Sequence, residues 1–151
     1  MGILTDEMKQ VVRAQRLAFV ATVCADGTPN VSPKGTATVW DDDHLVFADI
    51  DSPGTIANLR RNPAVEINIV DVFTRKGFRF KGTATVATDG ELLQQGIAFY
   101  QNAGMTDAPG RIRAIVLVRV ATARPLISPG YARGVSEAQM RAQWKKHYLG
   151  E

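Results

Sequence analysis

The order of its extended segments constrains the fold of this chain more than any other feature of the sequence. Five segments rich in β-branched and aromatic residues occur before residue 90, at 17–23, 30–39, 44–49, 65–70 and 77–88. Only one short helical segment interrupts them, so they do not form the alternating strand and helix units of a parallel sheet. A sixth extended segment follows at 111–123. We therefore predict a mainly β fold, a six-stranded antiparallel sheet curled into a barrel with peripheral helices.

The turns between the first segments carry strong local signals. Asp26-Gly27 lies between the first two segments, and Asp-Gly between extended runs is a strong indication of a β-hairpin. The second segment contains Pro33 and Gly35, which disfavour a regular central strand and indicate a bulge or the close approach of another backbone. Three consecutive aspartates at 41–43 form the next turn. They cannot all face one ion, so we predict no metal site there.

Four helices are expected around the sheet. Apolar residues spaced three or four apart over residues 4–12 predict a short opening helix. The pair Ser52-Pro53 is typical of a helix start, with serine as the cap and proline in the first turn. The remaining helices are expected at 91–102 and after Ser136, which begins a capping box.

Composition and charge indicate an ordinary globular protein. The 151 residues are 45% hydrophobic and 22% charged, which suits a single domain spanning residues 1–151. Cys24 is the only cysteine, so no internal disulfide forms, which is consistent with a reducing, cytoplasmic location. No segment resembles a signal peptide or is long and apolar enough to cross a bilayer. The net charge is +3 with scattered basic residues, so we expect neither nucleic acid nor membrane as a partner.

Two segments have the chemistry to bind an anionic ligand. Residues 52–55 start a helix, where free backbone N–H groups and hydroxyl side chains are available. Residues 31–36 form a broken strand whose free backbone groups can bond a flat heterocycle, with Lys34 supplying positive charge. Simple helix capping and a solvated edge bulge remain the alternatives. No nucleophile, P-loop, metalloprotease or dinucleotide motif is present, so a cofactor is expected to supply any redox chemistry.

The order and spacing of these motifs resemble one known family. The best-matching segments are LVFADIDSPGTIANLRRNPAVEI, which reads as strand, helix, Asn-Pro and strand, and GFRFKGTATV. With the segment TPNVSPKGT they make the chain similar, over about residues 10–125, to the pyridoxamine-phosphate-oxidase-like, FMN-binding split barrels. The resemblance implies a six-stranded antiparallel split β-barrel that binds FMN at the interface of a homodimer.

The resemblance and the two anion-binding segments together assign a set of cofactor contacts. The flavin is expected along the second strand, and its phosphate is expected to be held by that strand and by the start of the helix after the third strand. The end of the third strand contributes contacts as well. The start of the fifth strand contributes further contacts, and two C-terminal aromatic residues are candidates for reaching the partner subunit. The assigned residues are Ser32, Pro33, Lys34, Gly35, Thr36, Ala37, Thr38, Ala48, Asp49, Ser52, Gly54, Thr55, Gly77 and Arg79, with Tyr131 and Trp144 as the pair that reaches across.

The chain also departs from the oxidases of this family. Pro33 and Thr38 stand where their second strand carries Arg and Lys, and Gly54-Thr55 stands where their helix start carries an Arg-Lys pair. Their substrate-binding run of Tyr, Arg-Pro and Ser is missing from residues 97–106. We therefore do not expect oxidation of vitamin B6. Lys34 and Arg79 are expected to supply the charge that the phosphate of FMN needs, so alanine at either position weakens FMN binding.

The resulting functional prediction is an FMN-binding flavoprotein, an oxidoreductase whose substrate, electron donor and catalytic residues the sequence does not identify. Two alternatives stay open. One is a deazaflavin-coenzyme-dependent reductase on the same barrel, and the other is a non-catalytic module that binds a flavin or another ligand. The expected partners are the flavin, a redox substrate and a second copy of the chain.

Overall fold

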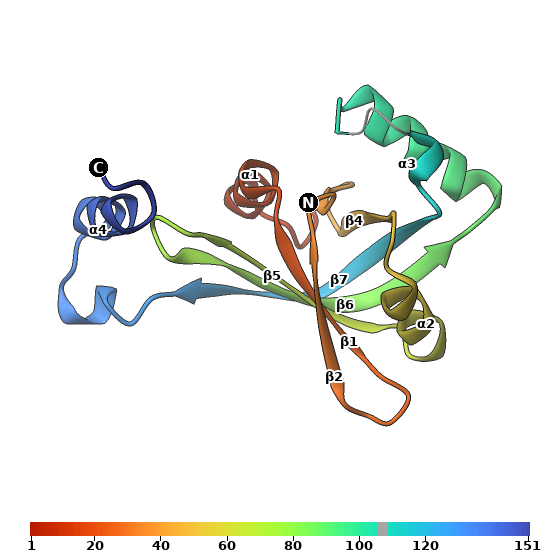
Figure 1. The fold of residues 1–151 in the computed structure, drawn as a ribbon, viewed down its shortest axis with the longest axis horizontal. Helices are drawn as coiled ribbons and strands as arrows, with labels where there is room; N and C mark the ends of the chain where they lie inside the picture. The colour runs from red at the N-terminus through yellow and green to blue at the C-terminus, as the bar shows by residue number, and fades with distance from the viewer. Residues whose placement is uncertain (106–108) are drawn as a thin grey trace.

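Seven antiparallel strands form one curled sheet, in the order β2-β1-β5-β6-β7-β4-β3. The computed structural model describes residues 1–105 and 109–151, so Thr106, at the end of segment 97–106, lies outside it. The strands are β1 (Ala18–Val23), β2 (Pro29–Lys34), β3 (Thr38–Val39), β4 (His44–Asp49), β5 (Ala64–Asp71), β6 (Lys76–Ala87) and β7 (Ala114–Ile127). The α-helices are α1 (Asp6–Gln15), α2 (Pro53–Arg61), α3 (Gly90–Asn102) and α4 (Glu137–Leu149) (Figure 1). Short 3-10 helices occur at Pro109–Arg111 and Tyr131–Arg133.

The predicted second strand, 30–39, is two strands in the structure, which corrects the strand count from six to seven. β2 pairs with β1, whereas β3 pairs with β4, and residues 35–37 belong to neither ladder. β2 and β3 therefore lie at opposite edges of the sheet. The segment that contains Pro33 and Gly35 is therefore not a simple bulge. Here the chain leaves one edge of the sheet and joins the opposite edge.

This short connection curls the sheet into a half-barrel. Lys34 and Thr38 are four residues apart, so an extended chain separates their Cα atoms by at most about 14 Å. The two edges of the sheet must therefore come close together at this point without pairing. We call the opening between them, at residues 34–38, the split. The backbone polar groups of residues 35–37 lie outside the ladders and are available to side chains or to a ligand.

The inner face of the sheet forms the main hydrophobic core. Val20, Phe47, Ile67 and Phe80 are at most 1% exposed there, and burying each such side chain stabilises the fold by about 1.5–3 kcal/mol. α1 closes one end of this core with its buried face, as predicted, and α3 covers a second cluster around Tyr100. None of the helices in the described ranges is long and apolar enough to span a membrane.

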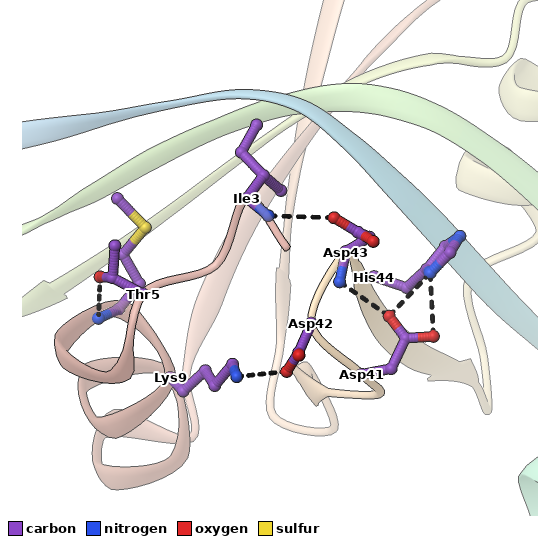
Figure 2. A network of polar contacts seen from close by, with 8 residues as sticks. Ile3, Thr5, Lys9, Asp41, Asp42, Asp43 and His44 are labelled. Atoms are coloured by element: carbon purple, nitrogen blue, oxygen red, sulfur yellow. Dashed lines mark hydrogen bonds and ion pairs between the residues drawn. The ribbon is translucent and has the colours of Figure 1, made fainter. Parts of the chain in front are cut away.

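The aspartates at 41–43 hold the N-terminal segment and the adjacent strand in place. Asp42 forms an ion pair with Lys9 of α1, and Asp43 Oδ1 accepts a hydrogen bond from the backbone N–H of Ile3 at 3.0 Å (Figure 2). Asp41 contacts His44 Nδ1 at 2.8 Å. Each carboxylate thus has its own protein partner, and the described part of the chain contains no group of three or more His, Cys, Asp or Glu residues placed to hold a metal.

Candidate functional site

A cluster centred on Lys34 lies in the split. Lys34 is the last residue of β2, and it is only 5% exposed. Its ammonium nitrogen Nζ donates hydrogen bonds to Ser32 Oγ at 2.5 Å and to Ser52 Oγ at 2.7 Å. Ser32 lies on the same strand, whereas Ser52 directly precedes α2. The lysine therefore links the free edge of the sheet to the start of the helix.

The Lys34 cluster has hydrogen-bond donors to spare. An ammonium group carries three N–H donors, of which the two serine oxygens take two. Each serine oxygen accepts from the lysine, so each hydroxyl can still donate its own hydrogen. The first turn of α2 adds the N–H group of the exposed Gly54, because the first N–H groups of a helix lack intrahelical acceptors. A Cβ built on Gly54 would meet no atom within 4 Å, so the space at this turn is open.

The start of α2 is where the sequence predicts it, but its serine does not cap the helix. The helix begins at Pro53, and the Ser52 side chain makes no capping hydrogen bond. The Ser52 hydroxyl is instead the acceptor for Lys34, and the Ser52 N–H donates to Asp49 Oδ1 at 2.7 Å. The free N–H groups of the helix thus remain unoccupied by its own cap residue.

Burial determines the protonation behaviour of Lys34. Loss of hydration lowers the pKa of Lys34 below its ordinary value, and the negative charge of nearby Asp49 partly opposes this effect. An anionic ligand at the cluster would act in the same direction as Asp49 and favour the charged ammonium. A bound anion would therefore stabilise the charged form of Lys34.

The lowered pKa of Lys34 makes stability depend on pH. The folded protein holds the Lys34 proton less tightly than the unfolded chain does, so this residue increases stability as the pH rises from its folded pKa toward 10.5. Lys34→Met keeps most of the side-chain volume and removes the titrating group. We expect the stability of the wild type relative to Lys34→Met to increase across this alkaline window, measured by urea unfolding at several pH values. A stability difference that does not change with pH would contradict a lowered pKa of Lys34.

Side-chain contacts hold the backbone of the split in one conformation. The Thr36 hydroxyl accepts a hydrogen bond from the Ala48 N–H at 3.0 Å and lies 3.2 Å from the Ala48 carbonyl oxygen. Tyr100, which is fully buried, donates its hydroxyl to the Thr36 carbonyl oxygen at 2.8 Å. Burial raises the pKa of Tyr100, so its hydroxyl stays protonated as a donor. The split is therefore a fixed feature of the fold.

The Lys34 cluster opens into a cavity of about 150 Å³. Six of its lining residues are among those that the sequence assigns to the cofactor, namely Pro33, Lys34, Gly35, Thr36, Ala48 and Ser52. Two others, Ile50 and the highly exposed Asp51, were not predicted. Both lie between assigned residues in the sequence, so continuity along the chain was the available signal. The structure thus brings the second-strand segment and the helix start into one site.

Four other assigned residues near the split are buried. Each of the four is at most 6% exposed: Ala37 2%, Thr55 3%, Asp49 5% and Thr38 6%. None of them lines the 150 Å³ cavity. Thr38 instead borders a separate cavity of about 360 Å³ between α1 and α3, lined also by Arg13, Arg16, Val39, Trp40, Phe99, Ala103 and Met105. Within one protomer these four residues support the site rather than line it.

Gly77 and Arg79 lie away from the Lys34 cluster. Arg79 on β6 is opposite Asn68 on β5, which is opposite Phe19 on β1. Phe19 is in turn opposite Pro33 on β2. Directly paired residues point to the same side, so all four side chains share the outer face of the sheet. Lys34, the neighbour of Pro33, points to the inner face. Within one protomer a single phosphate group therefore does not contact both Lys34 and Arg79. Their joint role in binding FMN remains a prediction.

Tyr131 and Trp144 each contact the turn between β5 and β6, and α4 lies beside this turn, at the end of the sheet away from α3 (Figure 1). The Tyr131 hydroxyl donates to the Thr74 carbonyl oxygen at 2.6 Å. The Arg75 guanidinium stacks on Trp144 at 3.4 Å from the ring centroid. These contacts fix both aromatic residues on a projecting arm, and their expected contact with a partner subunit remains a prediction.

Several solved structures share the fold of this chain. HupZ from Group A Streptococcus is 34% identical, with a TM-score of 0.73 over 82% of this chain and 94% of that chain. An FMN-binding protein from Syntrophomonas wolfei is 15% identical, with a TM-score of 0.67 over 81% and 85% of the two chains. An F420 reductase is 22% identical, with a TM-score of 0.63 over 80% and 98%. The last two comparisons show a shared fold.

The sequence also matches a protein-family model over most of its length. The model describes pyridoxamine 5'-phosphate oxidase and matches residues 4–126. A search of curated proteins finds no match. The family match covers the whole split barrel, including the Lys34 cluster and the start of α2. The chain therefore belongs to the pyridoxamine 5'-phosphate oxidase family of split β-barrels.

Proposed function

We propose that this protein is an FMN-dependent oxidoreductase that holds the phosphate of FMN at the Lys34 cluster. One observation carries the proposal: the Lys34 ammonium and the hydroxyls of Ser32 and Ser52 converge beside the first turn of α2. When bound, FMN supplies the hydride or electron transfer. The residues of the chain bind its phosphate and position its ring, and the substrate remains to be identified.

The donors of the cluster match the needs of a phosphate. A phosphate monoester presents acceptor oxygens and negative charge, and it binds best to charged donors and to helix N-termini. Lys34 supplies the charge, while the serine hydroxyls and the N–H group of the exposed Gly54 supply neutral donors. Asp49 does not compete for the same donors, because it accepts from the Ser52 N–H. The residues present therefore fit the phosphate end of FMN.

A titration of purified protein with three cofactors tests this function. FMN, riboflavin and the deazaflavin coenzyme F420 are compared by quenching of their fluorescence. We expect FMN to bind at least tenfold more tightly than riboflavin, since the two differ only in the phosphate. Equal affinities would show that the phosphate is not recognised. Preference for F420 would favour the reductase alternative, and binding of none of the three would overturn the proposal.

We also propose that the protein is a homodimer. Three large apolar side chains at the β1–β2 edge are exposed. Leu17, just before β1, is 46% exposed, Phe19 on β1 is 49% exposed, and Val31 on β2 is 59% exposed. Phe19 and Val31 share the outer face of the β1–β2 pair, where an apolar hollow of about 290 Å³ lies between β1 and β5. Neighbouring large apolar side chains of this kind mark an interaction surface. A second copy of the chain is the partner that suits a flavin site shared between subunits.

The homodimer is tested by light scattering on the purified protein. The wild type is expected at twice the chain mass of 16.4 kDa. Phe19→Asp places a charge on the proposed interface and is expected to shift the mass toward one chain. Gln94→Asp, an exposed position on α3 away from the β1–β2 pair, serves as the control. A wild-type mass of one chain at micromolar concentration would contradict the dimer.

A further inference from the structure

A second cationic cavity lies on the outer face of the sheet, away from the Lys34 cluster. Its volume is about 380 Å³, and it is lined by Arg79 and Lys81 of β6 and by Thr122 and Arg124 of β7. All four side chains are exposed and come from two adjacent, paired strands. We call these four residues the outer cationic cluster.

The pairing of the strands places like charges opposite each other. Arg79 is directly opposite Arg124, and Lys81 is directly opposite Thr122. Like charges directly opposite on neighbouring strands destabilise a sheet, whereas opposite charges there stabilise it. Repulsion between Arg79 and Arg124 therefore destabilises the free protein. A bound anion would reduce this repulsion.

One acidic residue offsets only part of this charge. Glu66 on β5 pairs with Arg79 at 2.6 Å and reaches Lys81 at 3.7 Å. Within the described residues, no carboxylate forms an ion pair with Arg124. Three cations and one carboxylate leave a net charge of +2 at the cavity. The threonine hydroxyl adds a neutral donor beside them.

We propose that the outer cationic cluster binds a compact anion carrying two or more negative charges. Phosphate or carboxylate oxygens are the atoms it recognises, because a guanidinium presents a planar fork of donors that matches both groups. The cavity is larger than one phosphate group, and its charge calls for at least two negative charges. Within one protomer none of the four residues lines the cavity at the Lys34 cluster, and we expect the anion to bind without flavin.

Calorimetric titration of the full chain at low salt tests the site, with pyrophosphate and citrate as the two probes. Arg124→Thr is the informative variant, because it removes one guanidinium and keeps a residue that favours strands. We expect at least a tenfold loss of affinity for the preferred probe, the usual scale for losing a charged hydrogen bond. A preference for pyrophosphate or for citrate separates phosphate ligands from carboxylate ligands.

Matched variants separate this site from general charge effects and from the flavin site. Arg119→Thr removes another exposed arginine from β7 that does not line the cavity, and Lys34→Met disables the first cluster. Arg119→Thr is expected to bind the probe like the wild type. Lys34→Met is expected to keep the binding that Arg124→Thr loses, and to lose only the probe that binds at the Lys34 cluster itself. Equal losses in Arg124→Thr and Arg119→Thr would overturn the site, and so would a loss confined to Lys34→Met. A loss of FMN affinity in Arg124→Thr would assign the cluster to the flavin and overturn a separate site.

The thermal stability of the free protein provides a second readout. Because Arg124→Thr removes the repulsion across the strands, we expect its ligand-free melting temperature to exceed that of the wild type by about 1–3 °C. The added probe should raise the melting temperature of the wild type and not that of the variant. A less stable free variant would contradict the repulsion on which the proposal depends.

Discussion

Lys34→Ala is expected to weaken FMN binding by about 1.5–3 kcal/mol, the contribution of a hydrogen bond to a charged group. This corresponds to a loss of about 10- to 150-fold in affinity. Riboflavin, which has no phosphate, should lose much less. The physical reason is that Lys34 supplies the positive charge of the cluster, and its two serine partners hold the ammonium in place. Titration by flavin fluorescence, with far-UV circular dichroism to confirm folding, measures the effect.

Asp51→Asn provides the matched control within the same cavity. Asp51 lines the cavity with Lys34 but carries the opposite charge, and its side chain is 84% exposed. Removing this negative charge should leave FMN affinity unchanged or slightly increase it. If Lys34→Ala and Asp51→Asn weaken FMN binding alike, the loss reflects disturbance of the cavity rather than recognition of the phosphate.

Gly77→Ala is expected to destabilise the protein by about 2–3 kcal/mol, near the upper end of the usual cost of overpacking. A Cβ on residue 77 would lie 1.9 Å from the Ile69 carbonyl oxygen and 2.7 Å from the Val70 Cα, both backbone atoms of the paired strand β5. For a domain of this size the melting temperature should fall by about 4–12 °C. Thermal unfolding without any flavin measures the effect, so it isolates packing from cofactor binding.

Gly54→Ala is the comparison for this substitution. A Cβ at Gly54 would meet no atom within 4 Å, and alanine suits the first turn of a helix. Its ligand-free stability should therefore equal or slightly exceed that of the wild type. If Gly77→Ala melts at the wild-type temperature, close packing against β5 does not explain this glycine, and the predicted contact with flavin becomes the better explanation.

Local patterns in the sequence predicted much of the fold. The segment 44–49 matches β4, the Ser52-Pro53 pair starts α2, and Ser136 with Gln139 forms the expected capping box. Each of these signals depends on residues within a few positions of one another. The division of 30–39 into two strands depends instead on which distant strands each half pairs with. No local pattern encodes that choice.

The candidate site was predictable to a similar extent. The segments around Lys34 and Ser52 were both identified, and the structure joins them through a hydrogen bond between residues 18 positions apart in the sequence. Lys34 and Arg79 were expected to act together, but alternation along β2 and β6 sends their side chains to opposite faces. Assigning those faces requires the register across β1 and β5, which the sequence does not specify.

A crystal structure of the protein with bound FMN tests the central claim most directly. We expect phosphate oxygens to lie within about 3.2 Å of Lys34 Nζ and to contact the first turn of α2. A phosphate bound at Arg79 and Arg124, with Lys34 still bonded only to Ser32 and Ser52, would contradict it.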